Sequence, residues 1–332
     1  MHFAAETFAN DLPQATPYNS DVSAILSSND SAAGGARLHK PSVVCVGETL
    51  WDFLPSGRFM GGAPFNVAAH LAKLGLHTTL ISRLGDDELG KEAADRMMLA
   101  GLDLSALQFD ATHPTGEARA LLDDSGSATY AFLSPAAWDA IEASPAALAS
   151  VQLADALVFG TLAQRAPLSS AAVLHLAAAA RYRIFDPNLR APHIDRALTL
   201  GSLSLAQMVK LNEVECALFG EWLNCGADPA ALLHSMQREF GVGSLCITRG
   251  SAGALLFHNG SWYEQVAFPC AVVDTVGAGD SFLAMLIAEL LRGSRPDVAL
   301  RRAARLAAYV ASQPGAVPDY DPVAFTGPDR PE

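Results

Sequence analysis

Asp274-Thr-Val-Gly-Ala-Gly-Asp-Ser-Phe282 runs directly into an apolar segment, residues 283–291, and the rest of the chain is organised around this stretch. Its glycines let the backbone turn tightly and approach a ligand closely, and the helix predicted to follow would direct its unpaired N–H groups at that ligand. Such a corner suits an anion. Asp280 would lie in the first helical turn, where its carboxylate could accept a proton from a hydroxyl group beside the anion. The alternative is an ordinary turn followed by a helix-start carboxylate that the helix dipole stabilises.

The composition narrows the class of protein. The chain has 332 residues, half of them hydrophobic, which suits one large α/β domain with an appendage as well as two domains. Lys and Arg total 22 against 35 Asp and Glu, a net charge of −13, so neither nucleic acid nor an anionic membrane is an expected partner. No apolar run approaches the roughly 18 residues that cross a bilayer.

The cysteines and the N-terminal segment indicate the compartment. Five scattered cysteines without a Cys-x-x-Cys pair predict reduced thiols in a cytoplasmic protein, without a zinc site. Residues 1–40 are rich in Ala, Ser, Asn and Asp and lack the pattern of a secretory signal. We expect these residues to form a poorly ordered tail.

Beyond residue 41, short β-branched runs alternate with segments of helical spacing, which predicts a mostly parallel sheet with helices on both faces. Buried strands are predicted over residues 42–47, 78–82, 154–159, 182–185, 208–211 and 244–248. Helices are predicted over residues 67–75, 86–99, 169–181, 213–219, 229–240 and 297–312. Residues 54–59 form a turn-rich link. Residues 117–122 and 128–132 predict a hairpin outside the main sheet, around a turn at 123–126, and residues 253–268 are hairpin-like.

Polar or glycine-rich residues follow the predicted strands, at the edge where parallel sheets bind ligands. Asp52 and Asn66 offer a carboxylate and an amide to a hydroxylated substrate, and a polar run, residues 186–190, follows a later strand. A nucleotide needs amide donors and small residues at its phosphates. Candidates for that role are Thr248, Gly250, Gly253 and the segment Gly277-Ala278-Gly279.

The stretch from Asp274 to Phe282, together with Gly61-Gly-Ala-Pro-Phe-Asn66, resembles the signatures of the ribokinase-like (PfkB-type) carbohydrate kinases, specifically the fructokinase branch. The resemblance covers roughly residues 42–326. It implies an α/β fold with a mostly parallel sheet, helices on both faces and a small β-sheet lid. The kinase domain would span residues 41–326, with lid segments near 51–62 and 115–135.

The resemblance also implies a reaction, the transfer of the γ-phosphoryl group of ATP to a primary hydroxyl of fructose or a related sugar. Asp280 would accept the hydroxyl proton, and the amides of Gly277, Ala278 and Gly279 would form the hole for developing phosphoryl charge. Closure of the lid would exclude water from the site.

Further ligand contacts follow from the same resemblance. The residues implied for the sugar are Asp52, Gly62 and Asn66, and those for the nucleotide are Asn212, Thr248, Gly250 and Gly253. Two further candidates for the sugar come from the sequence itself: Arg190 could clamp a sugar or phosphate oxygen, and Trp138 could lay its ring against a sugar face. Glu215 would organise Mg²⁺ through water. Carbonyls of Asp274 and Val276, beside the 313–315 loop, match the place where members of the family often bind a monovalent cation such as K⁺.

Several of these residues have structural alternatives. Asp52 could simply end a strand, Asn66 could cap a helix, Glu215 could be solvated, Arg190 could belong to a turn with an ion pair, and Trp138 could pack at the lid interface. Phe65 and Trp138 depart from the fructokinase pattern, which leaves 2-keto-3-deoxygluconate, ribose or a nucleoside as alternative substrates. A sugar-binding regulator without catalysis is the remote alternative. Lid strands in this fold can pair between subunits, which allows a homodimer.

Overall fold

A mostly parallel sheet of eight strands forms the centre of the computed structural model, which describes residues 40–54, 57–122 and 128–327. Six strands, from β12 to β4 in the order β12-β11-β10-β9-β1-β4, are parallel, and β13 and β14 continue the sheet antiparallel beyond β12. The strands are β1 (Ser42–Val46), β4 (His77–Ile81), β9 (Ala156–Phe159), β10 (Arg183–Phe185), β11 (Met208–Asn212), β12 (Ser244–Thr248), β13 (Ala254–His258) and β14 (Ser261–Gln265).

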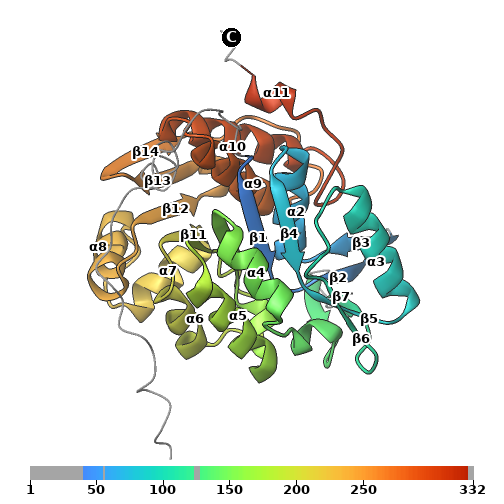
Figure 1. The fold of residues 1–332 in the computed structure, drawn as a ribbon. Coiled ribbons are helices and arrows are strands. Elements are labelled where there is room, and N and C mark those ends of the chain that lie inside the picture. The colour runs from blue at the N-terminus through green and yellow to red at the C-terminus, as the bar shows by residue number, and fades with distance from the viewer. Residues whose placement is uncertain (1–39, 55–56, 123–127, 328–332) are drawn as a thin grey trace, which may run out of the picture. The chain divides into compact units, whose positions relative to one another are not determined.

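Helices cover both faces of this sheet, which confirms the predicted α/β architecture (Figure 1). One layer consists of α4 (Pro145–Leu153), α5 (Pro167–Ala179), α6 (Arg196–Leu203), α7 (Glu213–Trp222) and α8 (Pro229–Phe240). The other contains α2 (Ala63–Lys73), α9 (Ala278–Leu291) and α10 (Pro296–Ala311), with the short α11 (Val323–Thr326) against α10. The sequence reading missed α4 and α6. Both begin at a side-chain cap, Ser144 and Asp195, but are short.

The period of two along a strand divides the core between these layers. Val209 and Leu211 of β11 belong to the apolar cluster that includes Val173 of α5 and Phe219 of α7. Lys210, the residue between them, therefore points to the opposite face, where its Nζ comes close to Gly279 of α9. The strand thus carries a buried lysine toward the helix that follows the glycine-rich stretch.

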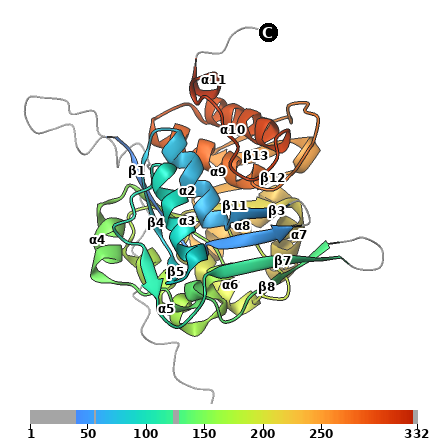
Figure 2. The same cartoon turned by 90° about the vertical axis from the view of Figure 1, so that its right-hand side faces the viewer.

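A separate four-stranded sheet, in the order β3-β2-β7-β8, lies beside the main one (Figure 2). Its strands are β2 (Leu50–Leu54), β3 (Gly57–Gly61), β7 (Gly116–Leu122) and β8 (Ala128–Phe132). The predicted hairpin of β7 and β8 is confirmed, while its turn at 123–126 and the predicted tail up to residue 39 lie outside the described residues. The turn-rich link expected at 54–59 was largely wrong, because residues 57–61 pair with β2 as a strand.

The base of this small sheet is fixed to α3 (Glu88–Leu99), which connects the two paired strands β5 (Arg83–Gly85) and β6 (Gln108–Asp110). Trp51 of β2 is fully buried, and its Nε1 donates to Leu89 O at 3.0 Å. Arg58 and Arg96 each lie over its ring, 4.5 and 4.8 Å from the centroid. The sheet is therefore anchored at β2.

Glu48, in the link between β1 and β2, places its carboxyl group at the start of α2. Its Oε1 accepts from Ala63 N at 3.3 Å, and the side chain is 4% exposed. Within the described chain, α2 itself has no side-chain cap and no acidic residue in its first turn. Burial raises the pKa of Glu48 to about 7, against the lowering effects of its backbone hydrogen bonds and the charge of Arg190.

Replacement of this carboxylate by an amide should stabilise the protein at alkaline pH. Because the folded-state pKa lies above the ordinary value of 4.5, ionisation between pH 4.5 and 7 opposes folding. We expect Glu48→Gln to raise the free energy of unfolding at pH 8 by at most about 3 kcal/mol and to change it little at pH 4. Urea denaturation at both pH values measures this.

The matched control is Glu88→Gln, because Glu88 is a first-turn acid of α3 that is almost fully exposed. It should leave the free energy of unfolding nearly the same at both pH values. A variant of Glu48 that is less stable than the parent at pH 8 would contradict the assignment.

Candidate active site

The predicted corner at residues 274–282 places Asp280 at the start of α9, directly against α2. Asn66 Nδ2 donates to Asp280 Oδ2 at 2.8 Å, and the two side chains are 4% and 8% exposed. Gly277 immediately precedes the helix in a left-handed conformation, with φ 77°. A Cβ there would lie 2.4 Å from Ala316 O, so only glycine fits this position. Asn66 lies inside α2 rather than at its cap, so its capping alternative is wrong.

Buried charges surround the Asp280 carboxyl. Burial raises its pKa, while the charge of Lys210, the hydrogen bond from Asn66 and the charge of Arg190 lower it. Asp186 adds a negative charge that raises it. The carboxyl therefore holds its proton more tightly than an exposed aspartate does, as suits a group that must take a proton from a hydroxyl.

Lys210 and Asp186 form a buried ion pair behind this corner, which the sequence reading missed. Lys210 Nζ lies 3.0 and 3.2 Å from the two oxygens of Asp186, and both residues are 5% exposed. The same nitrogen lies 3.3 Å from the position that a Cβ on Gly279 would occupy. Burial alone lowers the pKa of Lys210, but the charges of Asp186, Glu215 and Asp280 outweigh it and the net shift is upward. A lysine within an otherwise apolar buried strand was the available signal.

On the side of the small sheet, Asp52 of β2 lies over the start of the Gly-Gly segment. A Cβ on Gly61 would fall 2.2 Å from Asp52 Oδ2. A Cβ on Gly62, which has φ 107°, would lie 2.5 Å from Glu48 O. Burial raises the pKa of Asp52 to about 6, and the charge of Arg190 opposes this shift. Arg190 is exposed and donates to Leu189 O at 3.1 Å. The charge of Arg190 also lowers the pKa of Glu48 and of Asp280, so one guanidinium group favours the ionised form of three carboxyl groups.

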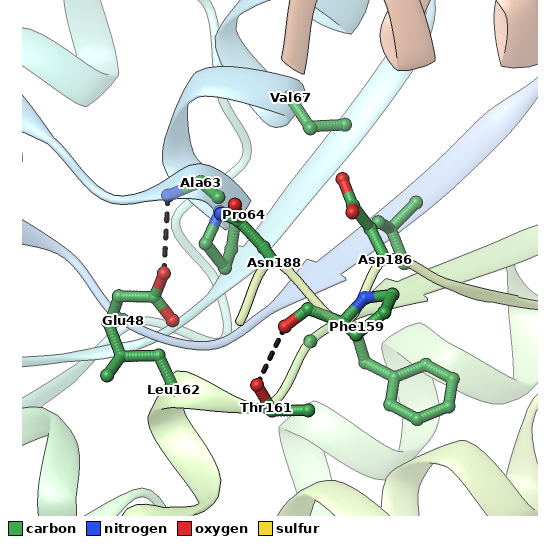
Figure 3. A pocket seen from close by; sticks show the side chains of 12 residues that line it. Glu48, Ala63, Pro64, Val67, Phe159, Thr161, Leu162, Asp186 and Asn188 are labelled. Carbon is green, nitrogen blue, oxygen red and sulfur yellow. Dashed lines mark hydrogen bonds between the residues drawn. The ribbon is translucent and has the colours of Figure 1, made fainter. Parts of the chain in front are cut away.

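A pocket opens between these groups, where the carboxyl end of β9 meets the start of α2 (Figure 3). Glu48 and Asp186 both line it, together with Pro64, Phe159 and Asn188. Thr161 Oγ1 donates to Pro187 O at 2.7 Å, which fixes the loop beneath it. The pocket therefore lies between the Glu48 carboxyl group and Asp186, the anion of the ion pair behind Asp280.

The residues predicted for the nucleotide gather at the neighbouring strand ends. Asn212 ends β11 opposite Thr248 of β12 in the sheet register. Asn212 Oδ1 accepts from Glu215 N, while Glu215 Oε2 accepts from Asn212 N, both at 2.9 Å, which forms a capping box. Glu215 Oε1 accepts from Leu189 N at 2.8 Å, and the residue is 3% exposed. The solvated alternative for Glu215 is therefore wrong.

The two glycines of this region have different surroundings. A Cβ on Gly250 would meet no described atom within 4 Å, so its surface is open to a ligand. A Cβ on Gly253 would lie 2.0 Å from Gln265 O, at the end of β14. Packing against β14 is therefore sufficient to explain Gly253.

The structure brings together the two segments predicted to hold a monovalent cation. Asp274 Oδ1 accepts from Val276 N at 2.9 Å, and Asp274 Oδ2 accepts from Gly315 N at 3.3 Å. Ala278 N donates to Thr275 O at 3.3 Å, so this amide is engaged by the turn itself. In the part of the chain that the structure describes, no three His, Cys, Asp or Glu side chains cluster as metal ligands.

The sugar-facing role predicted for Trp138 is not supported, because the ring has no free face. It is 1% exposed, lies within the apolar core beneath β7 and carries the Arg165 guanidinium 3.7 Å from its centroid. A Cβ on Gly116 would be 2.4 Å from its Nε1. Arg165 in turn forms a bidentate ion pair with Asp139, in which Nε and Nη2 lie 2.7 and 2.8 Å from the two carboxylate oxygens. Trp138 is therefore a packing residue between the core and β7 of the small sheet, in line with the packing alternative rather than the sugar contact.

The assembled corner can hold an anion at the start of α9 and a hydroxyl group beside the Asp280 carboxyl. The chemistry available is therefore proton acceptance next to a bound anion, at the carboxyl edge of a parallel sheet.

None of the described helices is both long and apolar enough to cross a bilayer.

Comparisons with known proteins agree with this geometry. A fructokinase of Salmonella typhimurium is 31% identical over 265 residues, which covers 76% of this chain and 85% of that protein. One from Escherichia coli is 30% identical over 260 residues, covering 74% and 83%. The structure of Xylella fastidiosa fructokinase with bound ATP superposes with a TM-score of 0.75 at 23% identity, over 86% of this chain and 98% of that one.

A second solved structure, of a double mutant of Vibrio cholerae fructokinase with fructose, ADP and a potassium ion bound, gives a TM-score of 0.72 at 23% identity and covers 83% of this chain and 94% of that one. The family model described as pfkB family carbohydrate kinase matches residues 42–322, nearly the whole of the described chain. With its glycine-led helix and buried aspartate in place, the chain belongs to the pfkB family of carbohydrate kinases.

Proposed function

We propose that this kinase transfers the γ-phosphoryl group of ATP to a primary hydroxyl of fructose or a closely related neutral sugar. The observation that carries the proposal is the buried Asp280 carboxyl, held by Asn66 at the glycine-led start of α9. The fructokinase relatives and the bound fructose and ADP of the Vibrio cholerae structure support the choice of substrate and nucleotide.

Each side of the corner has a proposed role. Asp280 accepts the proton of the sugar hydroxyl, and the amides of Gly277 and Gly279, at the start of α9, stabilise the charge on the transferred phosphoryl group. Ala278 was predicted to share this role, and its amide contributes if the bond to Thr275 O opens. Because phosphoryl transfer proceeds through a loose transition state, positioning and charge supply most of the rate.

The sugar is proposed to lie between the small sheet and α2, in contact with Asp52, Gly62 and Asn66. Asn66 Oδ1 is buried and lacks a hydrogen-bond partner among the described residues, so a sugar hydroxyl can supply the missing donor. The surrounding charge favours a neutral substrate over a 2-keto-3-deoxy acid. Arg190 is the cation predicted for an acidic substrate, yet its charge already acts on Glu48, Asp52 and Asp280.

ATP is proposed to lie along the strand ends marked by Asn212, Thr248 and Gly250. Mg²⁺ would be carried by the phosphates, since it keeps several waters and needs few protein ligands. Both oxygens of Glu215 already accept backbone amides, so this residue would contact the ion through water. K⁺ would be held by carbonyls of Asp274 and Val276, where the Gly315 contact fixes the loop.

Two further properties are part of the proposal. The five cysteines are unpaired, which supports a cytoplasmic location. In the small sheet, β3 and β8 are the edge strands, and pairing of such edges between subunits would give a homodimer.

The first test is Asp280→Asn, assayed by ADP release with fructose, ribose, 2-keto-3-deoxygluconate and adenosine, with and without K⁺. The parent enzyme should turn over fructose fastest, and the variant should lose several orders of magnitude in kcat while sugar affinity by calorimetry stays nearly unchanged. Turnover by Asp280→Asn within tenfold of the parent would show that Asp280 is not the proton acceptor. Release with none of the four acceptors would favour a sugar-binding regulator.

A second test uses the pH dependence of sugar binding. As pH falls through about 6, Asp52 gains a proton and can no longer accept hydrogen bonds at both oxygens. The sugar KM should therefore rise about tenfold between pH 7 and pH 5, and Asp52→Asn should show a high KM that is constant over this range. A parent KM that does not vary with pH would exclude Asp52 as the contact.

The third test concerns the ion pair behind the base. Removal of the cation in Lys210→Met should move the acidic limb of the kcat profile to higher pH, because Lys210 lowers the pKa of Asp280. Removal of the anion in Asp186→Asn should move the limb the other way. Lys91→Met, at an exposed lysine of α3, is the control and should leave it in place. Shifts of equal sign for both site variants would contradict the electrostatic role.

A further inference from the structure

Helix α2 presents two buried polar side chains to the catalytic corner. Asn66 and His70 are four residues apart and so lie on one face of the helix, one turn from each other. Asn66 holds Asp280, whereas His70 Nε2 lies 2.9 Å from Ala316 O, in the loop that follows α10. His70 is fully buried, and the proposed reaction does not use it.

The contacts of His70 fix its protonation. A carbonyl oxygen only accepts, so Nε2 must carry the hydrogen that it donates to Ala316 O. Nδ1 is then an acceptor, and it receives the hydroxyl of Tyr320 at 2.8 Å. Burial lowers the pKa of His70 to about 4, so the ring stays neutral at physiological pH. Burial raises the pKa of Tyr320, so its hydroxyl keeps its proton.

The carbonyl that His70 holds is the one that backs the anion-binding turn. A Cβ on Gly277 would fall 2.4 Å from Ala316 O and 2.5 Å from Ala316 Cα, so the two backbones are in close contact. The neighbouring Gly315 N donates to Asp274 Oδ2, at the other end of the same turn. Any displacement of residues 315–316 would therefore move Gly277.

Tyr320 is itself held firmly. Its ring stacks on His70 at 5.7 Å and makes edge contacts with Phe325 at 5.5 Å and Tyr309 at 6.1 Å. Lys73, on the last turn of α2, lies 5.2 Å from the Tyr320 centroid and donates to Pro318 O at 2.9 Å. The segment after α10 is thus tied to α2 at several points.

From these contacts we propose that His70, supported by Tyr320, is a positioning residue for phosphoryl transfer. Its hydrogen bond holds Ala316 against Gly277 and so fixes the position of the anion-binding amides relative to Asp280. The same helix, α2, positions Asp280 through Asn66. The inference rests on the proposed function of the corner as a phosphoryl-transfer site. Its consequence is that one rigid helix aligns the base and the anion hole together, at the end where the sugar is proposed to bind.

The test compares His70→Leu, which removes the donor, with His70→Gln, whose side-chain amide can replace it, and with Tyr320→Phe. The matched control is His258→Leu, because His258 is also buried and hydrogen-bonded, to Ser244 at 2.8 Å, but lies on β13 away from the corner. The readouts are kcat, the sugar KM and hydrogen–deuterium exchange of a peptide covering residues 274–281.

We expect His70→Leu to lower kcat at least tenfold with a sugar KM within twofold of the parent, Tyr320→Phe to lower kcat less, and His70→Gln to restore most of it. Amide exchange in residues 274–281 should accelerate in His70→Leu and stay unchanged in His258→Leu. Exchange that stays at the parent rate in His70→Leu, or an equal loss of kcat in the control, overturns the proposal. If His70→Leu does not fold, Tyr320→Phe decides: faster exchange at residues 274–281 with a lower kcat supports the proposal, and exchange and kcat at the parent values overturn it.

The exchange measurement separates this proposal from the proposed function. A parent enzyme that phosphorylates no sugar would refute the function, while faster exchange at residues 274–281 would still show that His70 orders the turn. Conversely, an active parent with unchanged exchange in His70→Leu and Tyr320→Phe would refute the positioning role alone.

Discussion

The hydrogen bond from Asn66 to Asp280 joins two segments 214 residues apart in the chain, and the active corner depends on it. A buried carboxylate is costly unless it is paired or hydrogen-bonded, so the fold must bring compensating groups to it. Helix α2 supplies the amide, β11 supplies Lys210 from behind, and the loop after β10 supplies Arg190 from the solvent side. The parallel sheet makes this convergence possible, because its strands all end at one edge.

The cost of burying so much charge explains several features beyond Asp280. Glu48 is placed at the start of α2, Glu215 is held by two backbone amides, and Asp186 is neutralised by Lys210. Each of these carboxyl groups is held by a helix start or a cation. Arg190, the cation predicted for an acidic substrate, acts by its charge on Glu48, Asp52 and Asp280, which supports the proposal of a neutral sugar.

Much of this was predictable from sequence, for identifiable reasons. Buried strands show as short β-branched runs, and α8 and β12 have the predicted bounds, because Asp228 and Pro229 mark a helix start clearly. The glycine-rich stretch identified the corner itself. The strand β3 was missed because its residues have the composition of a turn, and they form a strand only by pairing with β2.

The remaining features depend on packing that no local pattern reveals. Trp138 looked like a sugar platform but is covered by Arg165, while Gly253 packs against β14. Lys210 and His70 lie in apolar stretches of sequence, and the tertiary structure supplies their partners, Asp186 and Ala316. Sequence spacing can place a side chain on a face, but the partner on that face comes from the tertiary structure.

The central claim, that a buried Asp280 held by Asn66 takes the proton during phosphoryl transfer, is tested most directly by the pH dependence of the single-turnover rate. The account predicts a rate that falls at acidic pH, with an apparent pKa above that of an ordinary aspartate, and a limb that vanishes in Asp280→Asn. A rate that is constant through the acidic range, or a limb that Asp280→Asn retains, would contradict it.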